Sequence, residues 1–265
     1  MNRKGPSLVI DGLEELHVVP PERLEQVALL DRDDMRFVIR AEQLPAILES
    51  LRDEYGVVLA GGRRLGRYRT VYYDTPDFQL YHEHHRGRRP RVKVRTREHV
   101  DRGLGFLEVK RKTPRGATSK FVRPRSLEQS SWGTEDAAFV REHAGVDPDV
   151  LAPVLGVSFE RVTLVGKESP ERVTLDLSVA FERGGTEVRI EPVVTVEVKQ
   201  PKTLLRSTAA LAIRRADPTG LSVSKYCAGL ILTGAPVKRS GFWAEVRAIL
   251  RRAGLPDLPA APPAR

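Results

Sequence analysis

Four basic side chains stand at alternate positions in residues 91–97, and side chains with this spacing could act together on one ligand. In a β-strand, residues two apart project from the same face, so Arg91, Lys93, Arg95 and Arg97 share one face. Neighbouring like charges repel one another, and a surface that is merely solvated gains nothing from that repulsion. A bound polyanion would remove it. The pattern therefore indicates a face that binds phosphate groups through charge-assisted hydrogen bonds.

Carboxylates occupy the same kind of position beside basic residues in three other segments that read as strands. A carboxylate would repel phosphate directly, so its presence needs a separate role. Mg²⁺ or Mn²⁺ is typically held by one or two carboxylates, with water and phosphate oxygens at its other positions. The alternative is an ion pair with a neighbouring Lys or Arg. The candidates and their same-face neighbours are Glu108 with Lys110 and Lys112, Asp176 with Arg172 and Thr174, and Glu197 with Lys199.

The elements that must position these residues are mostly strands. Alternating patterns predict strands over residues 68–73, 91–97, 106–112, 157–165, 172–177 and 193–199. Helical spacing predicts helices over residues 22–30, 41–55, 135–143, 204–216, 225–232 and 242–252. Many strands without regular βαβ alternation favour an α+β fold, with a closed antiparallel β-barrel and helices packed outside it. Each strand also fits an ordinary sheet with one solvated face.

Composition predicts one large domain, over residues 31–253, that needs no disulfide to fold. Residues 1–30 are expected to form a partly flexible leader. Residues 254–265 hold four prolines and are expected to form a disordered tail. The single cysteine, Cys227, excludes a disulfide within the chain. No apolar run reaches the roughly 18 residues of a membrane span, and no signal peptide is evident, so we expect a cytoplasmic protein.

The charge balance narrows the class of partner. Lys and Arg number 44 against 35 Asp and Glu, a formal net charge of +9, which attracts anionic partners over long range. Aromatic residues make up only 6% of the chain, and the basic strands lack the interleaved stacking residues of single-stranded RNA platforms, so nucleic acid is not favoured.

The motifs taken together resemble a known family. These motifs are Asp31-Arg-Asp-Asp-Met-Arg-Phe37, Tyr68-Arg-Thr-Val-Tyr-Tyr-Asp-Thr-Pro76, Arg91-Val-Lys-Val-Arg-Thr-Arg97, Phe106-Leu-Glu-Val-Lys110, Val196-Glu-Val-Lys199 and Ser222-Val-Ser-Lys-Tyr226. With them the sequence is similar, from about Asp31 to Thr233, to the bacterial branch of the VTC domain, the polyphosphate polymerase fold among the CYTH-like triphosphate tunnel metalloenzymes.

The resemblance implies roles for individual residues in a basic tunnel. Catalytic contacts are implied for Arg95, Arg97, Lys110 and Arg161. Contacts to nucleotide or polyphosphate are expected from Arg36, Lys93, Lys120, Arg172, Lys199, Ser224 and Lys225. Glu197 matches the metal-binding glutamate of the family, and Glu108 and Asp176 are further candidates. Two positions depart from the family: Arg36 stands where lysine is usual, and His99 where an aromatic residue, usually tyrosine, is common.

The implied activity is that of a phosphotransferase that moves the γ-phosphate of ATP onto polyphosphate, with Mn²⁺ or Mg²⁺ as cofactor. A separate transmembrane partner chain, at the inner face of the membrane, would fit the resemblance. Two alternatives remain open: a triphosphate or polyphosphate hydrolase on the same fold, and a binding module for polyphosphate or RNA without catalysis.

Other motifs are weaker. His82, His84 and His85 could suggest a metal site, although an exposed turn or edge is the expected setting. No phosphate-binding loop of the Gly-x-x-x-x-Gly-Lys type is present. The basic run at residues 86–91 could bind nucleic acid, but it fits a solvated loop at the mouth of the barrel.

Overall fold

The structure is a computed structural model, and it describes residues 10–27, 32–129, 131–204 and 206–258. Two compact units are present, and each is built from three stretches of the chain. Unit 1 comprises Met1–Leu65, Val162–Asp176 and Val194–Ser222. Unit 2 comprises Gly66–Arg161, Leu177–Val193 and Val223–Arg265. We describe each unit by itself.

Unit 1 contains the strands and helices of the N-terminal part of the chain, together with α5. Its elements are β1 (Val18–Val19), α1 (Pro21–Gln26), β2 (Arg32–Arg40), a 3-10 turn (Ala41–Gln43), α2 (Leu44–Leu51), β3 (Tyr55–Val58) and α5 (Thr208–Ala216).

Unit 2 contains the strands β4 to β7 and β10 in full. Its elements are β4 (Gly66–Asp74), α3 (Gln79–His85), β5 (Arg91–His99), β6 (Leu104–Lys112), β7 (Thr118–Arg125), α4 (Thr134–Ala144), β10 (Thr186–Arg189), α6 (Lys225–Leu232) and α7 (Trp243–Ala253), with 3-10 turns at Val100–Arg102, Pro148–Val150 and Ser240–Phe242. Three long strands have residues in both units: β8 (Ala152–Gly166), β9 (Arg172–Arg183) and β11 (Val193–Pro201).

The strands form one sheet in the order β2-β11-β9-β8-β4-β5-β6-β7, with β1, β3 and β10 paired beside this path. The α+β fold is confirmed, but the expected closure of the barrel is wrong: in the described residues no pairing joins β2 to β7. The sequence of β7 explains why the sheet can end there. Pro124 lacks a backbone N–H and therefore suits an edge strand, as do the charged side chains Lys120 and Arg123.

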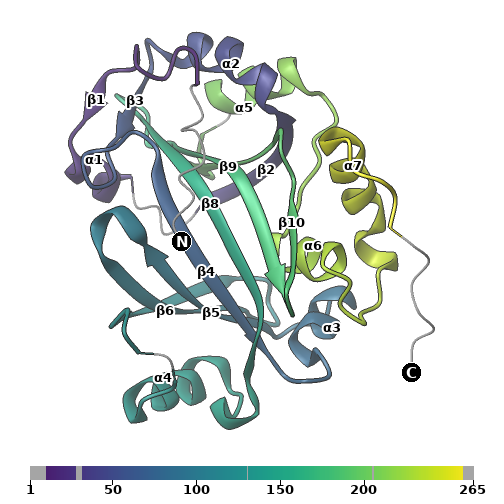
Figure 1. The fold of residues 1–265 in the computed structure, drawn as a ribbon. Helices are drawn as coiled ribbons and strands as arrows, with labels where there is room; N and C mark the ends of the chain where they lie inside the picture. The colour runs from purple at the N-terminus through teal and green to yellow at the C-terminus, as the bar shows by residue number, and fades with distance from the viewer. Residues whose placement is uncertain (1–9, 28–31, 130, 205, 259–265) are drawn as a thin grey trace. The chain divides into compact units, whose positions relative to one another are not determined.

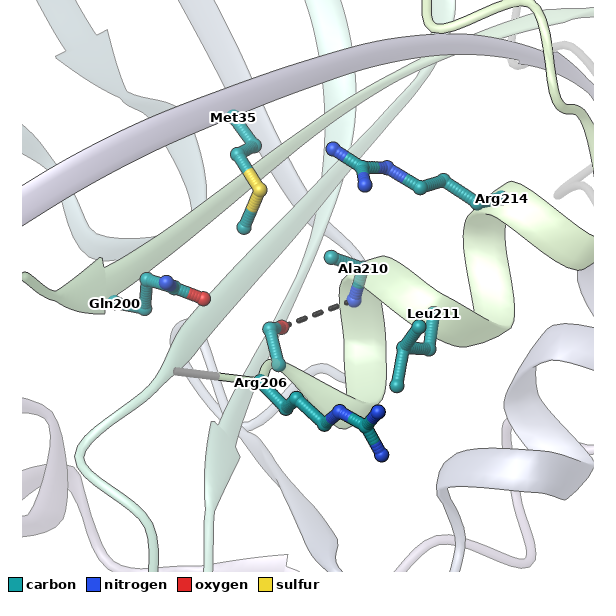
Figure 2. Close-up of a pocket in the computed structure, with 7 residues that line it drawn as sticks. Met35, Gln200, Arg206, Ala210, Leu211 and Arg214 are labelled. Atoms are coloured by element: carbon teal, nitrogen blue, oxygen red, sulfur yellow. Dashed lines mark hydrogen bonds between the residues drawn. The ribbon is translucent and has the colours of Figure 1, made fainter. Parts of the chain in front are cut away.

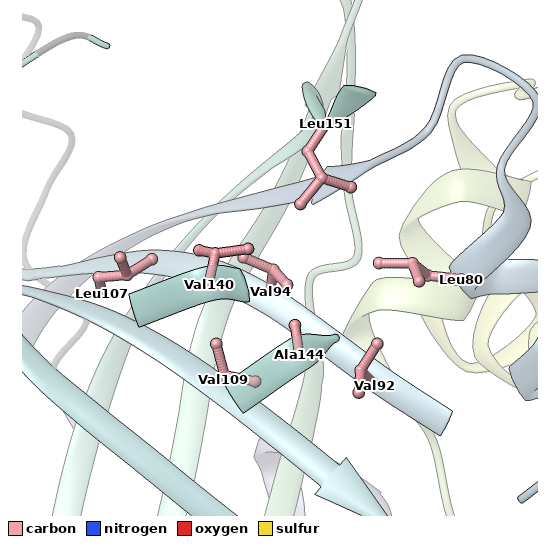
Figure 3. Close-up of a cluster of buried hydrophobic side chains, with 8 residues drawn as sticks. All are labelled: Leu80, Val92, Val94, Leu107, Val109, Val140, Ala144 and Leu151. Carbon is pink, nitrogen blue, oxygen red and sulfur yellow. The ribbon is translucent and has the colours of Figure 1, made fainter. Parts of the chain in front are cut away.

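The apolar faces of β5 and β6 form the core of unit 2. Figure 3 shows Val140, on α4, next to Leu107 and Val94. Val92, Val109 and Ala144 belong to the same cluster. Figure 1 shows β4, β5 and β6 as neighbouring strands with α4 next to β6, and α7 beside α6. The alternation predicted for residues 91–97 is therefore observed, and the basic side chains occupy the face opposite this cluster.

Unit 1 has its own core around α2. Leu44, Ile47, Leu48 and Leu51 are all buried, as the helical spacing predicts, and Pro45 lies in the first turn, where a missing N–H does no harm. The helix ends at Leu51, so the last residues of the predicted span 41–55 instead lead into β3.

The predicted leader, as far as it is described, packs on unit 1. Ile10, Leu13 and Leu16 are buried there, β1 pairs with β3, and Arg23 donates to the carbonyl oxygen of Gly166 at 3.0 Å. Most of the predicted C-terminal tail, residues 259–265, lies outside the described residues. Within the described part of the chain, no helix is both long enough and apolar enough to cross a membrane.

Candidate functional site

The basic face of β5 and β6 in unit 2 carries an ion network around Glu108. This carboxylate is only 4% exposed. Arg95 contacts its Oε2 at 2.6 Å from Nε and 2.5 Å from Nη2, and Lys120 contacts its Oε1 at 2.7 Å. Burial raises the pKa of Glu108, but Arg95, Arg97 and Lys120 lower it more, so the net pKa lies well below its ordinary value. Both oxygens contact cations, which favours the ion-pair alternative for Glu108 over the metal alternative.

Three lysines, one of them Lys120 of this network, stand side by side across the strands. Lys93 of β5 is opposite Lys110 of β6, and Lys110 is opposite Lys120 of β7. Lys93 donates from Nζ to the hydroxyl oxygen of Ser224 at 2.9 Å. Like charges directly opposite each other on neighbouring strands destabilise a sheet. The lysines therefore repel one another across the three strands, in addition to the repulsion between successive basic residues along β5.

A second group of cations surrounds the ring of Phe159 on β8. The charged groups of Arg97, Arg161 and Lys225 lie 5.8, 5.1 and 5.3 Å from its centroid. Arg97 also donates from Nε to the hydroxyl of Thr70 at 3.3 Å. Burial, followed by repulsion from Arg95, lowers the pKa of the Arg97 guanidinium to about 10. A phosphate placed here would relieve that repulsion.

Aromatic rings continue from Phe159 along the edge of the basic face. Tyr68 stacks on Phe159 with 5.3 Å between centroids, His99 meets Tyr68 at 4.6 Å, and Phe106 lies 5.1 Å from His99. Burial, followed by the charge of Arg97, lowers the pKa of His99 to about 4, so its ring is neutral at physiological pH. A planar group such as a nucleobase could stack on rings of this kind.

Unit 1 holds a separate cluster in which two cations share two carboxylates. Arg36 contacts Glu197 at 2.8 Å and Asp34 at 3.4 Å, and Lys199 contacts the same two carboxylates at 2.7 and 3.6 Å. Burial lowers the pKa of Lys199, while Glu197 and Asp34 oppose that shift. Arg172 is half-buried.

Asp176, a further predicted residue of unit 1, is only 3% exposed. It lies opposite Thr195 in the pairing of β9 with β11.

The unit 1 cluster could hold a divalent cation of the kind predicted only if its ion pairs were exchanged for the metal, because both oxygens of Glu197 contact cations, as those of Glu108 do. Asp34 and Glu197 supply the one or two carboxylates that Mg²⁺ or Mn²⁺ needs when phosphate and water complete its shell. Among the described residues, no group of three or more His, Cys, Asp or Glu side chains is arranged to hold a metal ion. Asp34 was missed by the sequence reasoning, although it lies in the motif that contains Arg36.

The histidine motif has a structural setting different from the expected turn or edge. It forms α3, where His85 accepts a hydrogen bond from the backbone N–H of Gly241 at 3.0 Å, and His84 stacks on Phe242 at 5.6 Å. These contacts join α3 to the 3-10 turn Ser240–Phe242, which precedes α7. They supply no metal-binding group.

The predicted residues thus divide between the two units. The sequence reasoning missed Tyr68, Thr70, Tyr72 and Phe159, although alternation along residues 68–73 places the first three on one face. Unit 2 contains Lys93, Arg95, Arg97, Glu108, Lys110, Lys120, Arg161, Ser224 and Lys225, and unit 1 contains Arg36, Arg172, Asp176, Glu197 and Lys199.

Comparisons with known proteins identify the family. The family model described as VTC domain matches residues 31–233, and the chain therefore belongs to the VTC domain family. The resemblance found in the sequence is confirmed. Membership supports a function related to polyphosphate or triphosphate and some activity in phosphoryl transfer. No curated protein matches the chain.

Solved structures show more distant likenesses. An adenylate cyclase candidate from Bacillus halodurans is 14% identical, with 72% of this chain and 91% of that chain covered and a TM-score of 0.44. HpAC1 from Hippeastrum, reported to have a dominant triphosphatase activity, is 13% identical, with 83% and 96% covered and a TM-score of 0.42. The Pct1 RNA triphosphatase of S. pombe is 12% identical, with 95% and 98% covered and a TM-score of 0.23. At these scores the likenesses carry no argument about activity.

Proposed function

We propose that the protein is a polyphosphate polymerase that transfers the γ-phosphate of ATP to the end of a polyphosphate chain. The observation that carries the proposal is the row of Lys93, Lys110 and Lys120 on three adjacent strands, beside Arg95 and Arg97. Like charges at directly opposite positions repel one another, and an extended chain of phosphates can interact favourably with several of these lysines together.

The basic face supports the binding part of the reaction. Arg95 is oriented by Glu108 and by the Tyr72 hydroxyl, to which its Nη1 donates at 3.2 Å. A guanidinium held in this way is pre-organised for phosphate oxygens, because it loses little freedom when the substrate arrives. Arg97 and Arg161, beside Phe159, are proposed to hold the nucleotide, whose base would stack on the neighbouring rings.

Phosphoryl transfer depends mainly on positioning and charge stabilisation. In the proposed reaction, a terminal oxygen of the polyphosphate chain attacks the γ-phosphorus. The bond from this phosphorus to the oxygen of the β-phosphate breaks, and ADP leaves. The acceptor oxygen is already ionised, so no general base is required. We propose Glu197, with Asp34, as the ligands of Mn²⁺ or Mg²⁺, which when bound would neutralise charge on phosphate oxygens.

A hydrolase is the alternative on the same residues, since water can replace the phosphate acceptor. The two reactions differ in their products. Purified protein incubated with ATP and Mn²⁺ should yield a polymer of phosphate on a gel, with ADP released in equal amount to the phosphate incorporated. Orthophosphate without polymer would favour the hydrolase.

Variants link either product to the basic face. Lys110→Ala removes an exposed lysine of the row, and Glu197→Ala removes the proposed metal ligand. Each should lower the rate by about 100-fold, the loss seen when one group that stabilises developing charge is removed. Arg69→Ala is the matched control, because Arg69 lies on the opposite face of β4 from Tyr68 and Thr70 and is 68% exposed. Equal rates in Lys110→Ala and Arg69→Ala would refute the assignment.

A further inference from the structure

A pocket of about 240 Å³ lies in unit 1, away from the residues assigned above. It is lined by Met35 of β2, Gln200 of β11, and Arg206, Ala210, Leu211 and Arg214 from the segment that enters and forms α5 (Figure 2). Its volume is at the small end for ligand sites, which suits a molecule of few atoms. The lining combines an apolar part with two arginines.

Gln200 contributes to the pocket a hydrogen-bond acceptor that has no donor in the described part of the chain. The residue is only 8% exposed, and its Nε2 donates to the carbonyl oxygen of Leu204 at 3.0 Å, which fixes the orientation of the amide. Its Oε1 is buried and receives no hydrogen bond from any group in the described part of the chain. Figure 2 shows this oxygen directed into the space between the lining residues. A buried acceptor left without a donor costs about 1–3 kcal/mol, so a ligand that donates here is favoured.

The positive charge of the pocket favours a ligand that also has an anionic group. Arg206 and Arg214 both line it, and among the described residues no carboxylate does. Ser207, the N-cap of α5, accepts from the backbone N–H of Ala210 at 3.0 Å (Figure 2), so the positive end of the helix adds to the same potential. Leu211, which lies between the two arginines in chain order, is 42% exposed and offers apolar surface to a ligand.

We propose that this pocket binds a small organic anion that also carries a hydroxyl or amino group. The anionic group would lie against Arg206 and Arg214, and the hydroxyl or amino group would donate to Gln200 Oε1. The carbon frame would contact Met35 and Leu211.

The proposed site is distinct from the carboxylate cluster of the same unit. Met35 stands between Asp34 and Arg36 in β2, and Gln200 follows Lys199 in β11, so alternation directs the pocket residues to the opposite face of both strands. The proposal is independent of the proposed polymerase activity.

Met35 provides a reporter for the test, because the chain has only one other methionine, Met1. The full chain, labelled with ¹³C at the methionine methyl groups, would be titrated with glycerol 3-phosphate and, separately, with 3-hydroxybutyrate; Met35→Leu assigns the signal. A saturable shift of the Met35 methyl with either probe supports the proposal, and the two probes distinguish a phosphate ester from a hydroxycarboxylate. Sulfate, an anion without a donor, should bind at least about tenfold more weakly than the better probe.

Variants assign the shift to the pocket. Arg214→Ala and Gln200→Leu should each weaken binding by roughly tenfold, whereas Arg215→Ala, which removes the adjacent exposed arginine, should leave it unchanged. Arg36→Ala should also leave it unchanged. The proposal is overturned if neither probe saturates, if sulfate binds as well as the better probe, or if Arg36→Ala abolishes a shift that survives Arg214→Ala.

Discussion

Replacing Glu108 by glutamine tests how the basic face of unit 2 is held together. The substitution keeps the size of the side chain and removes its charge. In the wild-type protein this carboxylate contacts both Arg95 and Lys120. Without it, these cations and the neighbouring Lys93 and Lys110 repel one another with no carboxylate at the centre of the network. We therefore expect Glu108→Gln to be less stable than the wild type.

The magnitude follows from the exposure of the partners. Breaking a buried ion pair typically costs about 3–5 kcal/mol, and the lower end, about 3 kcal/mol, applies because the Lys120 side chain is 43% exposed. For a chain of this size that corresponds to a fall in Tm of roughly 6–12 °C. Polyphosphate should offset part of this loss, because its phosphates replace the missing negative charge. The rise in Tm on adding polyphosphate should therefore be larger in the variant than in the wild type.

The pH dependence provides a second readout. The folded pKa of Glu108 lies below its ordinary value of 4.5, so the carboxylate stabilises the protein fully above about pH 4.5 and less as the pH falls towards the folded pKa. The difference in free energy of unfolding between wild type and variant should shrink over the same range.

Thermal unfolding with and without polyphosphate would measure these effects, with Arg69→Ala as a control on the opposite face of β4. The reasoning would be refuted by a variant as stable as the wild type, or by a polyphosphate-induced rise in Tm that is no larger than in the wild type. A metal role for Glu108 predicts something different, namely that the variant loses stabilisation by Mn²⁺ but keeps its stability without the metal.

Two further substitutions test the surroundings of the basic face. Burial and nearby arginines lower the pKa of His99 from 6.5 to about 4, so the unfolded chain binds the proton more readily than the folded one. As the pH falls from 6.5 to 4, His99 should therefore lower the free energy of unfolding by at most about 3 kcal/mol. In His99→Tyr, urea unfolding should show a smaller loss over that range; an unchanged slope would contradict the assignment. Gly229→Ala should cost about 1–3 kcal/mol, because the new Cβ would lie 2.5 Å from Phe181 and 2.7 Å from Leu155. Gly156→Ala, whose nearest contact is 3.6 Å, is the control, and equal Tm values in the two variants would contradict this packing.

Strand alternation made the basic face predictable, because it depends only on the direction of successive side chains. It correctly assigned Val92 and Val94 to the core and the basic residues between and beyond them to the other face. The lateral row of lysines was not predictable in the same way. It depends on the register of β5, β6 and β7, and a one-residue slip would have separated the three side chains.

Other features were hidden because tertiary contacts define them. The helix α3 has only seven residues, so its sequence shows too little helical spacing to be distinguished from a turn. The residue before it, Phe78, has a left-handed backbone conformation. The buried carboxylate of Asp74 stabilises it by accepting hydrogen bonds from the backbone N–H groups of Leu80 and Tyr81, at 2.9 Å each. Pro124 similarly obscured β7, since proline disfavours a central strand but is tolerated at an edge.

The basic face of unit 2 and the carboxylate cluster of unit 1 differ in their charge balance, and this difference suggests different roles for their carboxylates. Among the predicted site residues, unit 2 holds seven cations and one carboxylate, Glu108, whose oxygens already contact Arg95 and Lys120. In the proposed function, this excess of positive charge among the predicted residues favours a ligand rich in negative charge, such as a phosphate chain. In unit 1, Arg36 and Lys199 are matched by Asp34 and Glu197. In the proposed function, a divalent cation that arrives with bound phosphate would add little net charge to such a matched cluster, so the carboxylates would not repel the substrate.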